Sequence, residues 1–91
     1  EIRVALANGE HKNIQVSRLV VKIGYAPNTE PFLGQLNMTE DGHIIVDSSC
    51  ATSTEGVFAI GDIVADGYPR IATAVGQGMM AAAAIRKYLN K

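Results

Sequence analysis

Residues 54–62 read Thr-Glu-Gly-Val-Phe-Ala-Ile-Gly-Asp, in which a short apolar stretch lies between two glycines and ends at an acid. Val57 to Ile60 has the composition of a buried strand, and Gly61 ends it with a backbone that a ligand can approach closely. Asp62 follows at the carboxyl end of this strand, where open α/β sheets bind their ligands. A carboxylate there can accept hydrogen bonds from ligand hydroxyls, such as those of a ribose or ribityl chain. A second interpretation stays open: Asp62 only caps a neighbouring backbone N–H.

A helix is predicted from about Arg70 to Leu89, with Pro69 in its first turn. Apolar and small residues recur there at helical spacing. We expect four of them to face inward: Ile71, Val75, Ala82 and Ile85. The first turn presents free N–H groups and a partial positive charge to an electron-rich ligand. Gly76 and Gly78 each cost about 1 kcal/mol of helix propensity relative to Ala, which indicates close packing against backbone or ligand. Packing is favoured for Gly78, and both interpretations remain open for Gly76.

The other predicted elements are strands. Ile2 to Val16 alternates around an Asn-Gly turn at residues 8–9 and predicts a hairpin. Leu19 to Ile23 is a nearly continuous β-branched run, typical of a strand that is buried on both faces. A short strand is expected at His43 to Asp47. Strands together with a long helix place the chain in the α/β class.

Composition excludes several kinds of function. The 91 residues carry a net charge of −1 without a run of one sign, so neither nucleic acid nor an anionic membrane is expected as a partner. Cys50 is the only cysteine, which excludes an internal disulfide and a cysteine-rich metal site. We interpret its thiol as a bystander in a polar loop and expect a reducing, cytoplasmic location. His11 and His43 have no nucleophile or acid at a motif spacing, so no catalytic residue and no metal ligand is predicted.

Two motifs carry a resemblance to a known family. Residues 54–78 resemble the C-terminal FAD motif of two-dinucleotide-domain flavoprotein reductases, roughly Thr-x-x-x-Gly-Val-Phe-Ala-x-Gly-Asp followed by a helix with spaced small residues. Residues 24–29, Gly-Tyr-Ala-Pro-Asn-Thr, resemble the Gly-x-x-Pro-Asn-Thr segment at the return from the pyridine-nucleotide domain to the FAD domain. The match covers about Leu19 to Leu89. Because one helix follows Asp62 before the chain ends, the sequence resembles the thioredoxin reductase branch. Dihydrolipoamide dehydrogenase and glutathione reductase relatives continue into a dimerisation domain.

The resemblance implies the C-terminal part of a Rossmann-like flavoprotein with two dinucleotide-binding domains. Residues 1–23, the hairpin and the buried strand, are expected to end the NAD(P)-binding domain. Residues 24–91 are expected to form the C-terminal part of the FAD-binding domain. We therefore expect the chain to be a fragment, inactive alone, whose partner is the missing N-terminal FAD/NAD(P) portion.

The resemblance also implies a set of cofactor-binding residues: Gly61, Asp62, Ile63, Arg70, Ile71 and Ala72. Asp62 would bond the ribityl or pyrophosphate region of FAD, Gly61 would let FAD approach, and Ile63 would offer its N–H to a phosphate oxygen. Residues 70–72 would lie beside the isoalloxazine ring. The chain departs from the family here, because residues 69–71 are Pro-Arg-Ile where bacterial thioredoxin reductases often have Arg-Gln-Ala.

The implied function is that of an FAD-dependent oxidoreductase that passes reducing equivalents from NAD(P)H via FAD to a disulfide. A homodimer and a disulfide protein such as thioredoxin are the implied partners. In this family the Gly-x-Gly-x-x-Gly motifs and the redox Cys-x-x-Cys belong to regions upstream of this chain. Two alternatives remain. One is a ferredoxin–NADP reductase of the thioredoxin reductase type, and the other is a non-catalytic binding or regulatory module that keeps an FAD half-site.

Overall fold

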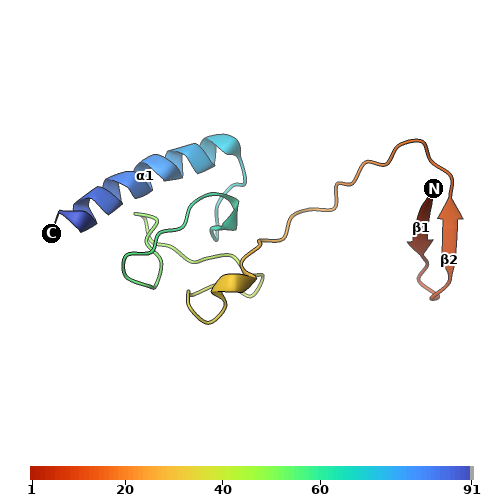
Figure 1. Ribbon diagram of the computed structural model, residues 1–91, viewed down its shortest axis with the longest axis horizontal. Helices are drawn as coiled ribbons and strands as arrows, with labels where there is room; N and C mark the ends of the chain where they lie inside the picture. The colour runs from red at the N-terminus through yellow and green to blue at the C-terminus, as the bar shows by residue number, and fades with distance from the viewer. Residues whose placement is uncertain (91) are drawn as a thin grey trace.

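The computed structural model describes residues 1–90, which hold one two-stranded sheet, two short 3-10 helices and one long α-helix (Figure 1). In chain order these are β1 (Ile2–Ala5), β2 (His11–Ile14), η1 (Glu30–Phe32), η2 (Gly61–Ile63) and α1 (Ile71–Leu89). The elements from η1 onward lie together, whereas the hairpin stands apart at the end of a long extended segment (Figure 1). No helix within residues 1–90 is long and apolar enough to cross a membrane.

The predicted hairpin is present. β1 and β2 pair antiparallel, with Ile2 opposite Ile14. The connecting loop is longer than the two-residue turn that the sequence suggested. Its turn is closed by the N–H of Gly9, which donates to the carbonyl of Leu6 at 3.0 Å. Of residues 8–9 only Gly9 has a positive φ, 86°, which a residue without Cβ adopts without strain.

The predicted strand at Leu19 to Ile23 is wrong for this chain. The segment runs as an extended connector (Figure 1) and pairs with no strand within residues 1–90. Its side chains face solvent, with Val20 88% and Ile23 91% exposed. A strand needs a neighbour for its backbone N–H and C=O groups, and the described residues provide none.

The core is small and lies between loops. Ile44, Ala59 and Val64 are buried at its centre. The strands predicted at His43 to Asp47 and Val57 to Ile60 are reduced to isolated bridges, in which Ile44 pairs with Met38 and Val64, and Phe58 pairs with Ala51. None of these bridges extends into a strand within residues 1–90, so the predicted strands are wrong as elements, although they contain the core residues Ile44 and Ala59.

Helix α1 has nearly the predicted bounds but presents a different face. The side chain it buries is Ala81, 5% exposed, whereas Val75 is 65% exposed. The four residues that were predicted to face inward are all exposed: Ile71, Val75, Ala82 and Ile85. The helix packs through small residues instead. A Cβ at Gly78 would lie 3.7 Å from Cδ1 of Ile60, whereas a Cβ at Gly76 would meet nothing within 4 Å. Close packing therefore explains Gly78 and leaves Gly76 facing solvent.

The dimensions are those of an open arrangement. The radius of gyration is 19.0 Å, whereas a compact domain of this length has about 12 Å. Apolar side chains of Leu19 to Ile23 and of the outer face of α1 remain in solvent. The described residues thus leave two apolar surfaces uncovered, on the connector and on the helix.

Candidate functional site

Two grooves meet at Asp62. The first, which we call the loop groove, has a volume of about 340 Å³ and its lining includes Tyr25, Asn28, His43, Asp62, Ile63 and Pro69. The second, the helix groove, has a volume of about 570 Å³ and its lining includes Tyr25, Asp62, Pro69, Arg70, Ile71 and Val75. Tyr25, Asp62 and Pro69 line both, so these grooves adjoin along one edge of the molecule.

A glycine turn presents Asp62 to the grooves. Gly61 has a φ of 84°, a conformation that a residue with Cβ rarely adopts. Its N–H donates to Oε1 of Gln77 at 2.7 Å, and its carbonyl accepts from the N–H of Val64 at 3.2 Å. The carboxylate of Asp62 is exposed and makes no hydrogen bond within residues 1–90. The capping interpretation is therefore not realised, and both carboxylate oxygens can accept hydrogen bonds from a ligand.

The segment around Ile44 holds this turn through backbone hydrogen bonds. The N–H of Ile44 donates to the carbonyl of Ile63 at 2.7 Å, and the N–H of Ala65 donates to the carbonyl of Ile44 at 2.8 Å. These two bonds fix the segment after Asp62 against the core. They also bring His43 into the loop groove, although the sequence gave no reason to connect it with Asp62.

His43 is oriented by a neighbouring acid. Its Nδ1 lies 3.0 Å from Oδ1 of Asp41. The Thr39 hydroxyl, which donates to Asp41, and then the His43 side chain lower the pKa of the Asp41 carboxyl from 3.8 to about 2. The pair places a charged carboxylate behind the imidazole at the edge of the loop groove.

The two sequence motifs come together in the structure. Thr29, the last residue of the Gly-x-x-Pro-Asn-Thr segment, is buried, and its hydroxyl donates to the carbonyl of Gly42 at 2.6 Å. This bond ties the segment to the turn that precedes His43. Tyr25 and Asn28 consequently line the same groove as Asp62, far away in sequence.

The first turn of α1 opens into the helix groove. Arg70 is the N-cap, its backbone is extended, and no side chain caps the helix. The first helical hydrogen bond runs from the N–H of Ala74 to the carbonyl of Arg70 at 3.1 Å, so the N–H groups of residues 71–73 have no partner inside the helix. Pro69 precedes the N-cap and does not lie in the first turn as predicted. This helix end carries partial positive charge beside the Asp62 carboxylate.

The predicted site residues take three kinds of position. Four of them line the grooves: Asp62, Ile63, Arg70 and Ile71. Gly61 shapes the turn without lining either groove, and Ala72 is exposed and lines neither. The sequence interpretation missed Gln77, which holds the Gly61 N–H. The available signal was a polar side chain between two glycines on the helix, in a stretch otherwise rich in Ala and Met.

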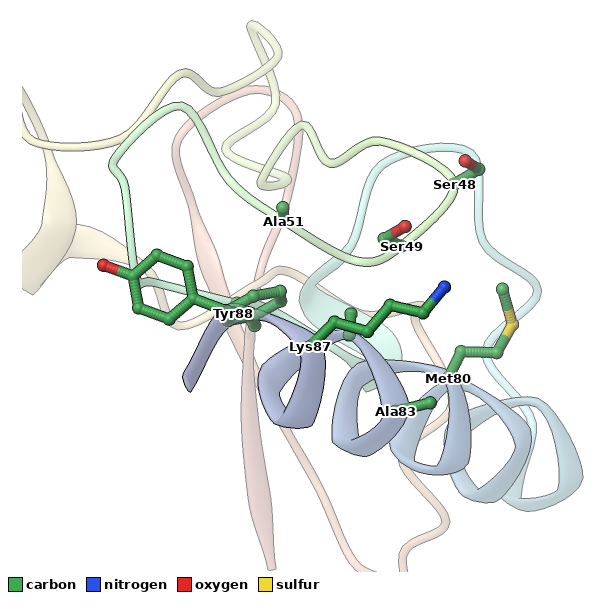
Figure 2. Close-up of a pocket in the computed structure, with 9 residues that line it drawn as sticks. Ser48, Ser49, Ala51, Met80, Ala83, Lys87 and Tyr88 are labelled. Carbon is green, nitrogen blue, oxygen red and sulfur yellow. The ribbon is translucent and has the colours of Figure 1, made fainter. Parts of the chain in front are cut away.

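A third groove lies away from these residues, with a volume of about 520 Å³. Figure 2 shows Met80, Ala83, Lys87 and Tyr88 on one side of α1, facing the loop that carries residues 48–51. None of the predicted cofactor-binding residues lines it.

Cys50 lies in the loop beside this third groove but is itself buried, with Sγ 3.8 Å from the carbonyl of Gln77. Burial and, secondarily, the charge of Asp47 raise the pKa of the thiol. A buried thiol with a raised pKa is a poor nucleophile, in keeping with its interpretation as a bystander.

Comparison with known proteins gives a consistent family. The model of the pyridine nucleotide-disulphide oxidoreductase family matches residues 1–78. The thioredoxin reductase of Rickettsia felis is 46% identical over 79 residues, which are 86% of this chain and 26% of that protein. The glucosaminate ammonia-lyase of Pseudomonas fluorescens is 36% identical over 88 residues, 91% of this chain and 27% of that protein. This chain thus spans about a quarter of the length of these relatives.

Solved structures agree with the sequence comparison. The crystal structure of T. acidophilum thioredoxin reductase superposes with a TM-score of 0.72 at 36% identity, covering 92% of this chain and 27% of that one. The thioredoxin reductase-like α/β fold class predicted from the sequence is therefore confirmed. By its motifs, its fold and these relatives, the chain belongs to the pyridine nucleotide-disulphide oxidoreductase family.

Proposed function

We propose that this chain supplies the C-terminal half of an FAD site in a longer oxidoreductase of the thioredoxin reductase type. The observation that carries the proposal is the exposed, unbonded carboxylate of Asp62 where two grooves meet, beside an uncapped helix start. The covered fraction of the relatives supports a longer protein, because about a quarter of their length matches here. The uncovered apolar surfaces support it as well.

The residues at the grooves suit FAD. A carboxylate only accepts hydrogen bonds, so Asp62 matches the hydroxyl groups of a ribityl chain better than the anionic pyrophosphate. The free N–H groups at the start of α1 match electron-rich atoms of the cofactor, such as carbonyl or phosphate oxygens. Gly61 keeps a Cβ out of the approach to the turn. We propose that the cofactor-binding residues are those predicted from the sequence: Gly61, Asp62, Ile63, Arg70, Ile71 and Ala72. Ala72 has the least support from the structure because it lines neither groove.

FAD, when bound, would supply the hydride and electron transfer from NAD(P)H to a disulfide. This chain's own residues would bind and orient: Asp62 would hold the ribityl hydroxyls, and residues 70–72 would place the helix start beside the ring. Residues 1–23 would belong to the NAD(P)-binding domain, which agrees with the hairpin standing apart from the grooves (Figure 1). Residues 24–91 would belong to the FAD-binding domain.

The partners follow from the same proposal. The rest of the oxidoreductase would cover the apolar connector and the outer face of α1. A second copy in a homodimer and a disulfide protein such as thioredoxin would complete the functional assembly. Because a thioredoxin reductase and a glucosaminate ammonia-lyase both match this region, the electron acceptor would depend on parts of the protein beyond these 91 residues.

The test is flavin content followed by reduction. The full protein that contains these residues should purify with visible flavin absorbance, and NADPH or NADH should bleach that absorbance under anaerobic conditions. Subsequent addition of oxidised thioredoxin should restore it, because its disulfide accepts the two electrons of the reduced flavin and becomes a dithiol. A colourless protein that does not take up FAD would contradict the proposal. A yellow protein that neither nucleotide reduces would indicate a binding module without oxidoreductase activity.

A further inference from the structure

Gln77 joins helix α1 to the turn that carries Asp62. Its side chain is half-buried, and Oε1 accepts the N–H of Gly61 at 2.7 Å. The carbonyl of Gln77 lies 3.8 Å from the Sγ of Cys50, so the same residue also contacts the loop behind the turn. One helical residue thus touches the chain on two sides of the core.

The Gly61 N–H depends on this side chain. Gly61, with a φ of 84°, begins η2, and its N–H has no backbone acceptor within residues 1–90, so a side chain must bond it. Around this hydrogen bond, glycines let the helix lie near the turn. A Cβ on Gly61 would lie 4.0 Å from that of Ala74, and a Cβ on Gly78 would lie 3.7 Å from Ile60. The polar link between helix and turn is therefore the hydrogen bond from Gly61 to Gln77.

The same side chain lies against the loop that closes the groove. A Cβ on Gly67, which lines the loop groove, would lie 3.9 Å from Nε2 of Gln77. The amide therefore sits between the Gly61 turn and the residue 64–67 loop, with its oxygen toward the turn. Asp62 follows Gly61 directly, so a change in rotation at Gly61 redirects the carboxylate.

We infer that Gln77 is a positioning residue, whose side-chain oxygen fixes the Gly61 turn so that Asp62 points into the two grooves toward FAD. This inference rests on the proposed function. It predicts that the accepting oxygen matters for FAD, and not the volume of the side chain.

The test compares three variants of the full protein that contains these residues. Gln77→Met keeps length and helix propensity but removes the acceptor, and Gln77→Glu keeps an accepting oxygen. Gln35→Met is the matched control, because the Gln35 amide also bonds backbone, the carbonyl of Pro31 at 3.1 Å, but lies outside both grooves. The readouts are the FAD dissociation constant, the visible circular dichroism of the bound flavin and the melting temperature of the apoprotein.

Gln77→Met should weaken FAD binding about tenfold, the effect of leaving one partly buried donor unsatisfied, and should change the flavin dichroism. Gln77→Glu should restore the wild-type dichroism and most of the affinity, and Gln35→Met should match wild type. Gln77→Ala provides the same comparison if the Met variant does not fold. A purely structural role would lower the melting temperature of the apoprotein and leave the flavin dichroism unchanged.

Three results would overturn the inference alone: wild-type affinity and dichroism in the variants that lack the acceptor, a lowered melting temperature with unchanged dichroism in those variants, or a Glu variant as weak as the Met variant. A wild-type protein that binds no FAD would overturn the proposed function and this inference with it. The wild-type measurement therefore separates the two failures.

Discussion

At the scale of single residues, Asp62 owes its availability to its neighbours. The N–H of Gly61 donates to Gln77, and its carbonyl accepts from Val64. The carbonyl of Ile63 accepts from the N–H of Ile44. The carboxylate between them is left without a bond inside residues 1–90. A group that the fold surrounds with satisfied polar atoms, yet leaves unpaired and exposed, is suited to bind a ligand.

Asp62→Asn should weaken FAD binding by the full protein. The amide keeps one accepting oxygen but loses the charge, and a hydrogen bond to a charged group contributes about 1.5–3 kcal/mol, or roughly 10- to 100-fold in affinity. The melting temperature of the apoprotein should stay near wild type because the side chain is exposed. Isothermal calorimetry with FAD provides the measurement.

Asp66→Asn is the matched control for this prediction. Asp66 is also exposed, follows the same turn and has a φ of 58°, which Asn tolerates well. It lines neither the loop groove nor the helix groove. Equal losses of affinity in both variants would assign the effect to general charge and not to a contact by Asp62.

Asp41, the acid that contacts His43, should make the stability of the fold depend on pH. A lowered pKa means that the folded state holds the charged form of Asp41 more tightly than the unfolded state. Its contribution to stability is therefore complete above pH 3.8 and is lost as the pH falls toward about 2. Thr39→Val should raise the pKa of Asp41 toward 3.8, because the Thr39 hydroxyl is the main cause of the shift. Carboxyl chemical shifts followed by NMR titration give this pKa directly.

Thr52→Val serves as the control, since the Thr52 hydroxyl bonds the carbonyl of Val57 and has no bond to Asp41. An unchanged Asp41 midpoint in Thr39→Val would show that the hydroxyl does not hold the carboxylate.

The sequence indicated Asp62 and Gly61 as candidate site residues, but it did not indicate the residues that hold them in place. Asp62 and Gly61 were recognisable because a strand-like run ends in glycine and acid, a local pattern. His43 and Gln77 reach the same region through the core and through α1, over separations that a motif does not encode. Their roles depend on where loops cross, which hydrophobic periodicity cannot reveal.

Among the elements, the bounds of α1 were predicted nearly correctly from the sequence, but the face that it buries was predicted incorrectly. Periodicity located the helix and identified its apolar stripe, of which Ile71 and Val75 are members. It could not say what the stripe faces. Within residues 1–90, α1 meets the turn around Ile60 and Gly61 through Ala74, Gly78 and the Gln77 amide, and it meets the loop of residues 48–51 further along. Ile71 and Val75 lie outside both contacts and remain exposed.

Neighbouring alanines on α1 test this orientation. Ala81→Gln should destabilise the chain by about 1–3 kcal/mol, because a longer polar side chain does not fit a site that is 5% exposed. Ala82→Gln should change stability by less than about 0.5 kcal/mol, because Ala82 is exposed. The free energy of unfolding in urea, followed by helical circular dichroism, measures both. The opposite ranking would restore the face that the sequence predicted.

Strand prediction failed for a related reason. Leu19 to Ile23 has the composition of a central strand, but composition cannot supply the neighbouring strands with which it must pair. The segments around Ile44 and Phe58 form only isolated bridges with their partners and no continuous strand. The hairpin succeeded because both of its strands lie within residues 1–16.

At the scale of the whole molecule, the apolar connector should drive self-association of the isolated 91-residue chain. Val20 and Ile23 are almost fully exposed, and an extended apolar segment with unpaired backbone groups invites pairing with another copy. Sedimentation velocity should show oligomers of the wild-type chain, and a Val20→Lys, Ile23→Lys double variant should be monomeric. Ser17→Lys adds charge to the same connector outside the apolar run and should behave as wild type. A monomeric wild-type chain at high concentration would contradict this prediction.

The isolated 91-residue chain should bind FAD only weakly. Asp62 and the start of α1 offer a few hydrogen bonds, each contributing about 1 kcal/mol net. Association costs at least about 4 kcal/mol in lost translational and rotational freedom, whereas a micromolar dissociation constant requires about −8 kcal/mol. Affinity for a ligand of this size comes largely from enclosed surface, and both grooves here are open to solvent.

Calorimetric titration of FAD into the 91-residue chain should therefore give a dissociation constant weaker than micromolar, and the full protein should bind far more tightly. The same titration with the Val20→Lys, Ile23→Lys variant excludes self-association as the cause of weak binding, because oligomers could cover the grooves. A nanomolar constant for the isolated chain would show that Asp62 and the helix start suffice for the site. The missing half would then serve catalysis and domain assembly and would not be needed to hold the cofactor.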